Sequence, residues 1–188
     1  MYQDEISGFG LTFKKLTIND LPSLVAWRND PHVLPFMDDT RKVDVRIMSA
    51  WFNRVSSLDT FQGYIVCRKD VPFAYSEFKD IDTTKGQVWE GIFFNPDFIN
   101  SGLFFNLQFV REMFLMQNNL GTIISQVRKI NHKSIKAQEN LGGEITREDE
   151  DFVYFTLTKE KRLQALYKFS TILGFDAEFK ETFKDWRE

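Results

Sequence analysis

The chain has 188 residues, of which 43% are apolar and 27% charged, and these values suit one folded domain with a short appendage rather than a disordered protein. The formal net charge of -3 disfavours a general nucleic-acid binder, which would usually be basic. Cys67 is the only cysteine and there are two histidines, so we expect no disulfide framework within the chain and no metal site.

No run of residues approaches the 18 apolar positions that a membrane-spanning helix needs. The first ten residues, MYQDEISGFG, lack the basic and apolar regions of a secretion signal. We therefore expect a cytoplasmic protein without a membrane partner.

The first half of the chain predicts one strand, two helices and a group of three strands. Residues 11–16 alternate apolar and polar, as a half-buried strand does. A helix follows from Pro22 and should end before Pro31, because a residue that precedes proline disfavours the helical conformation. An apolar stripe predicts a second helix over 43–55. Turn residues then separate three strand-like runs, at 61–68, 73–78 and 88–94.

The second half begins with a turn-rich segment at 95–102. Two helices are predicted at 103–118 and 134–141, and three strands at 122–127, 144–146 and 152–158. An antiparallel group of strands followed by a β-α-β unit indicates an α/β fold, in which a mixed, mostly antiparallel sheet is flanked by helices.

The character of the chain changes after Lys159. Leu163, Leu166 and Leu173 fall on one amphipathic helix, and Phe179 and Trp186 on another. We interpret residues 1–158 as the main domain and 159–188 as a C-terminal helical appendage. The apolar stripes of these helices fit packing on the same chain or a homodimer interface.

The turn before the long helix is the first candidate site. Asn100, Ser101 and Gly102 stand where backbone N–H groups and the helix dipole can hold a phosphate or pyrophosphate. The alternative is an ordinary helix start, and the segment contains neither a Walker loop nor a dinucleotide fingerprint.

A second pattern lies downstream, where a short strand leads to Asn131, then Ser134, then a helix that ends at Leu141-Gly142. By itself this pattern predicts a helix with Asn131 as its N-terminal cap and Gly142 after its last turn.

Together, the order of elements, the strand with Glu90, the Asn100-Ser101-Gly102 turn and Asn131-x-x-Ser134 resemble the GCN5-related N-acetyltransferase (GNAT) family over about residues 11–158. The resemblance implies that acetyl-CoA is the co-substrate. The family's loop usually has Arg or Gln where this chain has Asp97 and Gly where it has Asn100, and only its last glycine, Gly102, is kept. The resemblance implies cofactor contacts at Ile92, Phe93, Asn100, Ser101, Gly102, Leu103, Asn131 and Ser134, and leaves Lys129, Lys133 and Lys136 either near the ribose phosphate or on a solvated helix face.

Transfer of an acyl group from a thioester to an amine requires a neutral amine, a donor for the oxyanion and a proton for the thiolate. The resemblance implies that Glu90 is the catalytic base, and the alternative is a strand carboxylate in a hydrogen-bond network. The family's frequent acidic tyrosine falls at Gln138, which cannot protonate a thiolate. Ser134, a water molecule or Tyr154 remain candidates for the acid.

The resemblance also implies that the link between the first two helices borders the acceptor pocket, where Trp27, Arg28, Asn29 and Phe36 are the candidate substrate-binding residues. Arg28 could hold a phosphate or carboxylate, and the aromatic rings could stack on a sugar or base. The alternative is a helix end with a core tryptophan and a surface arginine. The segment resembles GNAT branches that acetylate nucleotide-linked amino sugars, as in pseudaminic acid synthesis, and ribosomal-protein N-terminal acetyltransferases.

The favoured interpretation is an acetyl-CoA-dependent N-acetyltransferase that acts on a small-molecule amine, with a nucleotide-linked amino sugar as the favoured acceptor. Two alternatives remain, a protein N-terminal acetyltransferase and a non-catalytic acyl-CoA-binding module.

Overall fold

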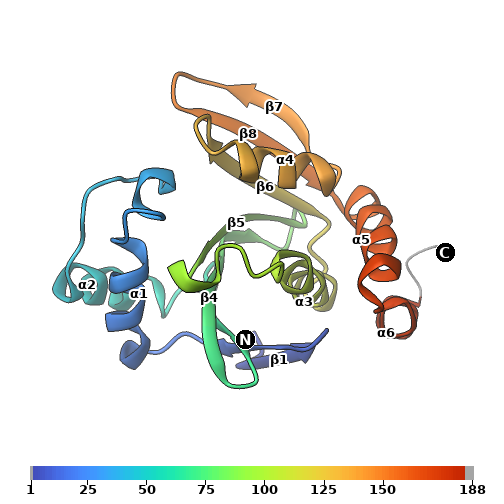
Figure 1. Cartoon of the computed structure of the whole chain (residues 1–188), viewed down its shortest axis with the longest axis horizontal. Coiled ribbons are helices and arrows are strands. Elements are labelled where there is room, and N and C mark those ends of the chain that lie inside the picture. Colours follow the sequence, from blue (N-terminus) through green and yellow to red (C-terminus); the bar gives the residue numbers. More distant parts are fainter. Residues whose placement is uncertain (1, 185–188) are drawn as a thin grey trace.

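The computed structural model describes residues 2–184, and Trp186 of the predicted last helix lies outside this range. One eight-stranded sheet runs through the molecule in the order β1-β2-β3-β4-β5-β6-β8-β7 (Figure 1). Every neighbouring pair is antiparallel except β5 and β6, which are parallel. The predicted mixed, mostly antiparallel sheet is therefore confirmed. The strands are β1 (Glu5–Gly8), β2 (Leu11–Lys15), β3 (Gln62–Arg68), β4 (Val71–Asp82), β5 (Gln87–Phe94), β6 (Thr122–Arg128), β7 (Glu144–Glu148) and β8 (Phe152–Thr158).

The helices flank this sheet in two groups. Figure 1 shows α1 and α2 together at one side of the molecule and α5 and α6 at the opposite side, with α3 between them. The helix α3 makes the crossover between the parallel strands β5 and β6, as such a connection requires. The α-helices found in the described residues are α1 (Leu21–Arg28), α2 (Val45–Val55), α3 (Phe104–Gln117), α4 (His132–Asn140), α5 (Lys159–Leu173) and α6 (Asp176–Thr182).

The strand β1 is absent from the predicted order of elements. It has four residues, of which Ile6 alone is a buried apolar residue, so it carries too little alternation to be recognised. Phe9 and Gly10 adopt positive φ angles of 53° and 75° and turn the chain back onto β2. A phenylalanine in this conformation is unusual, and its ring is fully buried, so core packing holds the turn in place.

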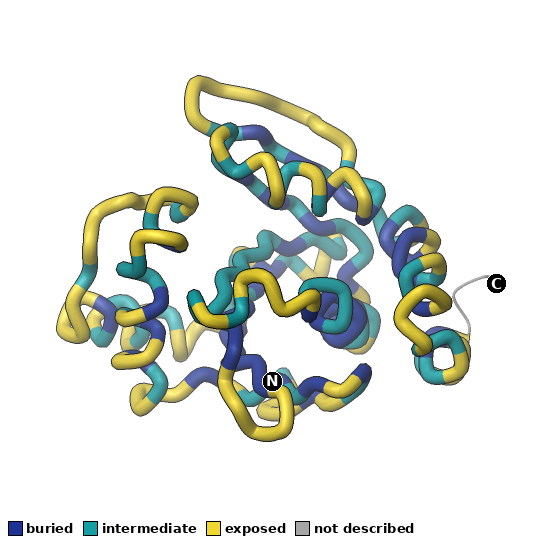
Figure 2. The backbone as a smooth tube through the Cα atoms, viewed as in Figure 1, coloured by how far each residue is buried: buried dark blue, intermediate teal, exposed yellow. Residues whose placement is uncertain are grey.

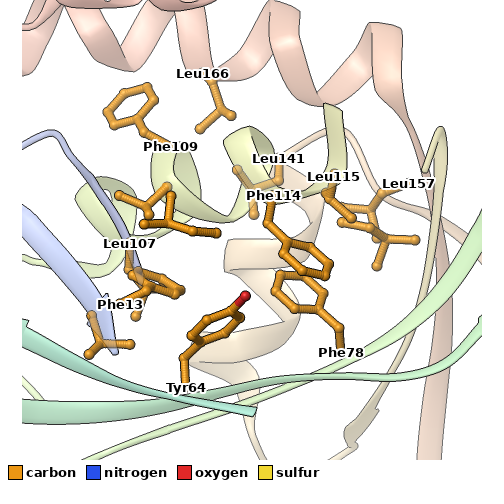
Figure 3. Close-up of a cluster of buried hydrophobic side chains, with 14 of the residues drawn as sticks. Phe13, Tyr64, Phe78, Leu107, Phe109, Phe114, Leu115, Leu141, Leu157 and Leu166 are labelled. Carbon is orange, nitrogen blue, oxygen red and sulfur yellow. The ribbon is translucent and has the colours of Figure 1, made fainter. Parts of the chain in front are cut away.

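The larger hydrophobic core contains aromatic rings and aliphatic side chains between the sheet and α3, α5 and α6 (Figure 3). Phe78 of β4 stacks on Phe114 of α3 with 4.0 Å between ring centroids. The helix α3 is buried along most of its length (Figure 2), because the sheet covers one side of it and α5 contacts another. A smaller cluster joins α1 and α2 to the opposite side of the sheet, with Cys67 as a buried core residue, as predicted.

The C-terminal helices pack directly on this core. Arg162 of α5 forms a buried two-point ion pair with Glu112 of α3, at 2.7 and 3.0 Å, and donates to the carbonyl oxygen of Leu157 at 2.7 Å. Phe179 and Phe183 are buried against the same cluster. None of the helices described for residues 2–184 combines the length and apolarity that a membrane crossing requires.

Candidate active site

The two parallel strands separate in the middle of the sheet. The pairing of β5 with β6 stops at Trp89 and Ile124, although the strands continue to Phe94 and Arg128. The backbone of β5 beyond Trp89 therefore has β4 as its partner on one side and no strand pairing on the other within the described chain. An extended ligand can pair with such a free strand edge through main-chain hydrogen bonds.

The start of α3 lies just after the end of β5. Gly102 has a φ of +75°, and a Cβ atom added there would meet nothing within 4 Å. No side chain caps the helix at Leu103, and the Leu103 N–H donates to Ser101 Oγ only at 3.4 Å. The first helical amides are thus open to an anionic group, as the prediction of a phosphate cradle requires.

Asn131 caps α4, as predicted, because its Oδ1 accepts from the Ser134 N–H at 3.1 Å. The helix ends with Gly142 at a φ of +85°, which also agrees with the sequence pattern. Of the three lysines considered for the phosphate, Lys133 comes within 3.5 Å of Asn100 at the start of α3. Lys129 pairs with Glu148 and Lys136 with Glu139 on the surface.

A cavity of about 460 Å³ opens between the separated strands, α1, α2 and α4. Four of the eight predicted cofactor residues line it, namely Ile92, Phe93, Asn131 and Ser134. The other four, residues 100–103, belong to the start of α3, whose first residue, Phe104, also borders the cavity. The structure therefore places four of the predicted cofactor residues in the lining of one cavity and the other four beside it in the chain, before Phe104. The cavity holds aromatic side chains from several elements, namely Phe36, Trp51, Tyr75, Trp89, Phe93 and Phe104.

Glu90 lies at the floor of this cavity in a buried polar network. Its Oε2 accepts from Arg111 Nη2 at 2.6 Å, and its Oε1 accepts from Gln138 Nε2 at 3.1 Å. The side chains of Arg111 and Glu90 are 1% and 4% exposed. Burial lowers the pKa of the Arg111 guanidinium, and the negative charge of Glu90 opposes this shift. This geometry fits the alternative of a strand carboxylate in a hydrogen-bond network better than a base that gains and loses a proton.

Gln138, at the position of the family's tyrosine, completes the same network. Its Nε2 also donates to Ser125 Oγ at 3.0 Å, so both amide hydrogens have acceptors. Its Oε1 is buried without a partner in the part of the chain that the structure describes. Of the two protein candidates for the acid, Ser134 lines the cavity, whereas Tyr154 donates to Asp149 on an exposed hairpin and does not line it.

Only some of the predicted acceptor residues line the cavity. Phe36 and Arg28 line the cavity, whereas Trp27 is a buried core residue. Arg28 donates to the carbonyl oxygens of Asp39 at 2.7 Å and Arg41 at 2.9 Å. Asn29 exchanges two hydrogen bonds with the backbone of Val43, at 2.6 and 3.0 Å. Arg28 and Asn29 thus fasten residues 37–44, the segment between α1 and α2 that we call the strap.

Arg128, at the end of β6, ties the strap from the opposite side of the cavity. It donates to the carbonyl oxygens of Met37 at 2.7 Å and Asp38 at 3.1 Å. Its guanidinium also lies 4.9 Å from the ring centroid of Phe152. Met37 and Asp38 line the cavity, so this contact holds one wall of the pocket in place.

Replacing Arg128 with methionine is expected to loosen the strap. Each hydrogen bond from a charged donor contributes about 1.5 kcal/mol or more, so we expect trypsin to cut after Arg41 or Lys42 roughly tenfold faster. Lys136→Met removes a surface ion pair of α4 and is the matched control. Equal cleavage rates in the two variants would contradict this role of Arg128.

Two site residues were missed by sequence reasoning, Arg111 and Glu77. Arg111 lies next to Glu112 in a mostly apolar helix, and buried charged residues in such a helix are a signal of ion pairs. Glu77 follows Ala74 and Tyr75 in β4 and is only partly buried, and because the strand also carries Lys79 and Asp80 its sequence gives a weaker signal.

Comparison with known proteins agrees with this geometry. Residues 10–144 match the family described as "Acetyltransferase (GNAT) domain", whereas no curated protein matches the chain significantly. A spermidine N-acetyltransferase from Vibrio cholerae, solved with CoA and spermine, superimposes with a TM-score of 0.74 at 15% identity, covering 83% of this chain and 99% of that one.

Two further structures have the same fold. An uncharacterised protein from Bacillus halodurans gives a TM-score of 0.72 at 16% identity, covering 87% of this chain and 91% of that chain. YncA from Salmonella typhimurium, solved with acetyl-CoA, gives 0.62 at 17% identity, covering 80% and 94%. The family match over residues 10–144, together with the separated strands and the open helix start, shows that the chain belongs to the GNAT family of acetyltransferases.

Proposed function

We propose that the protein transfers an acetyl group from acetyl-CoA to the primary amine of a small molecule. The observation that carries the proposal is the free edge of β5 beside a cavity, with the uncapped start of α3 at its end. The strand edge would pair with the pantetheine arm at Ile92 and Phe93, and the helix amides would hold the pyrophosphate. Acetyl-CoA would supply the activated acyl group.

A nucleotide-linked amino sugar is the acceptor that we favour. The aromatic side chains of Phe36, Trp51 and Trp89 line the cavity and could stack on a sugar or base. Arg54 also lines it and is a cation that a phosphate of the acceptor could meet. Arg28, in contrast, already donates to the strap.

A polyamine is the second candidate, because Asp38 and Glu77 place carboxylates at the same cavity. The similarity to a spermidine N-acetyltransferase agrees with this candidate. A peptide acceptor, as in the ribosomal-protein branch, would need an open groove, whereas the strap, fastened by Arg128, forms a wall of this cavity. A non-catalytic module would bind acetyl-CoA without acetylating any amine.

Release of free thiol from acetyl-CoA tests the proposal across a panel of UDP- and dTDP-linked amino sugars, polyamines and N-terminal peptides. We expect release with a small amine and none with the matching alcohol. Binding of acetyl-CoA without release for any amine would support the non-catalytic module instead.

A further inference from the structure

Two carboxylates approach the cavity from neighbouring strands, and they lie on opposite faces of the sheet. Glu90 of β5 is opposite Phe78 of β4, whose ring packs on α3. Glu77 of β4 is opposite Gly91, two residues from Tyr75, which belongs to the cluster with α1 and α2. Because successive strand residues point to opposite faces, Glu77 faces the half of the cavity that α1, α2 and the strap enclose.

The carboxylate of Glu77 has one anchored oxygen and one open oxygen. Its Oε2 accepts from the Tyr75 hydroxyl at 2.8 Å. Its Oε1 has Lys79 Nζ at 3.6 Å, beyond direct hydrogen-bond distance, and the same ammonium lies 3.8 Å from Asp38 Oδ2. The side chain of Glu77 is 16% exposed, against 4% for Glu90. Within residues 2–184, Glu77 Oε1 thus accepts no hydrogen bond and has only the long ionic contact with Lys79, whereas both oxygens of Glu90 accept hydrogen bonds.

Gly91 gives this carboxylate its place. A Cβ atom at Gly91 would lie 2.6 Å from Glu77 Oε1 and 2.8 Å from its Cγ, so the carboxylate rests directly over the glycine. Gly91 immediately precedes Ile92, where the proposed pantetheine arm would pair with β5. Glu77 therefore lies beside the path of the thioester rather than at a distant wall.

We propose that Glu77 is the carboxylate that binds the ammonium group of the acceptor and takes its proton. The inference rests on the proposed acetyl transfer and assigns a site within it. Lys79, held loosely between Glu77 and Asp38, shows that the two carboxylates accommodate an amine cation. The acceptor class is accordingly a primary alkyl or sugar amine that is protonated in solution.

The acceptor nitrogen loses two protons during the proposed transfer. The ammonium nitrogen gives one proton to Glu77 and forms the C–N bond with the thioester carbonyl carbon. When the tetrahedral intermediate collapses, the C–S bond breaks, and the second proton of the nitrogen goes to the departing sulfur. Glu77 then releases its proton to water. Burial and the charge of Glu77 raise the pKa of Tyr75 well above 10, so its hydroxyl stays protonated and keeps orienting the carboxylate.

The variant Glu77→Gln tests the role of the charge while keeping the shape and the bond to Tyr75. We expect kcat/KM to fall by roughly 10²–10⁴-fold at neutral pH, with acetyl-CoA affinity unchanged. The deficit should narrow as pH rises toward the pKa of the free amine, because solvent then supplies the neutral form, whereas a structural defect would lower the rate equally at every pH. Glu5→Gln, on the distant strand β1, is the matched control. The charged groups around Glu77 that bear on this profile are Asp38, Lys79, Tyr75 and Arg111.

A second variant tests the position of the carboxylate. Gly91→Ala should displace Glu77 and lower kcat/KM roughly tenfold or more. In the Glu77→Gln background the same substitution should have little further effect, because the effects of substitutions at contacting residues are not additive. Additive losses would show that Gly91 acts through the backbone and not through Glu77.

Ligand binding separates this inference from the proposed function. With CoA-loaded protein, calorimetry would compare UDP-glucosamine with UDP-glucose, and putrescine with butanediol. We expect Glu77→Gln to lower affinity for the amine of at least one pair by about tenfold and to leave the alcohols unchanged. Amine affinities equal to wild type, or turnover within about threefold of it, would overturn the role of Glu77. Absence of thiol release by the wild-type protein, with this binding difference intact, would overturn the proposed transfer alone.

Discussion

Replacing Arg162 with methionine is expected to lower the free energy of unfolding by about 3–5 kcal/mol, because Glu112 would be left buried without a counter-charge. The variant would also lose the donor to the carbonyl oxygen of Leu157, near the end of β8. For a domain of this size we expect the melting temperature to fall by about 10 °C. Urea unfolding followed by circular dichroism gives the free energy.

Two further variants define the mechanism of this loss. The double variant Arg162→Met with Glu112→Leu removes both charges, and we expect it to recover most of the stability, since a buried pair can be replaced by apolar groups of similar size. Lys180→Met breaks the exposed pair with Asp176 on α6 and should cost no more than about 1 kcal/mol. A double variant as unstable as Arg162→Met would show that packing and not charge is lost.

The ion pair of Arg162 bears on how α5 and α6 are attached to the rest of the chain. The sequence pattern left them as an appendage of the same chain or as a dimer interface. Arg162, together with the buried rings of Phe179 and Phe183, fixes them on α3 and the first hairpin. In addition, Glu178 of α6 accepts from the Phe9 N–H at 2.5 Å. Unfolding of Arg162→Met should therefore remain a single transition that includes the sheet.

Local patterns predicted most of the fold because each helix or strand is defined by residues that are close together in the sequence. The apolar stripe of α2 and the alternation of β8 carry their own period. The cap at Asn131 and the left-handed glycine after α4 likewise follow from residue types at fixed spacing. The strand β1 lacked such a pattern, because its partner β2 and the core under Phe9 define it.

The site was predictable only in part, since its decisive contacts join residues far apart in sequence. The sequence predicted that Glu90 is a site residue, but it could not show that Arg111, on the next helix, donates a hydrogen bond to the Glu90 carboxylate. Arg111 and Glu112 are adjacent, yet they are about 100° apart around the helix and so face different partners, Glu90 and Arg162. No periodicity reveals such a choice, because it depends on which elements the fold places around α3.

The second large effect is expected at the start of α3, for the variant Ser101→Asp. A carboxylate there would stand close to the proposed pyrophosphate, and like charges about 5 Å apart at an effective dielectric constant of about 20–40 repel by roughly 2–3 kcal/mol. We therefore expect the Kd of acetyl-CoA to rise roughly 30- to 150-fold. The same carboxylate interacts favourably with the helix dipole, so thermal stability without ligand should stay equal or rise slightly.

A weaker affinity for acetyl-CoA together with an equal or higher thermal stability would distinguish charge repulsion in Ser101→Asp from misfolding. Asp97→Asn removes an acidic residue of the same loop and should lower the Kd severalfold, and Lys133→Met, which removes the cation near Asn100, should raise it. Both shifts should shrink at high salt, because ions screen exposed charges. If Ser101→Asp bound acetyl-CoA as tightly as wild type, the pyrophosphate would not lie at this helix start. The cofactor would then have to be held by β5 and α4 alone. The helix α4 has 9 residues against 14 in α3, and Asn131 already caps its first turn.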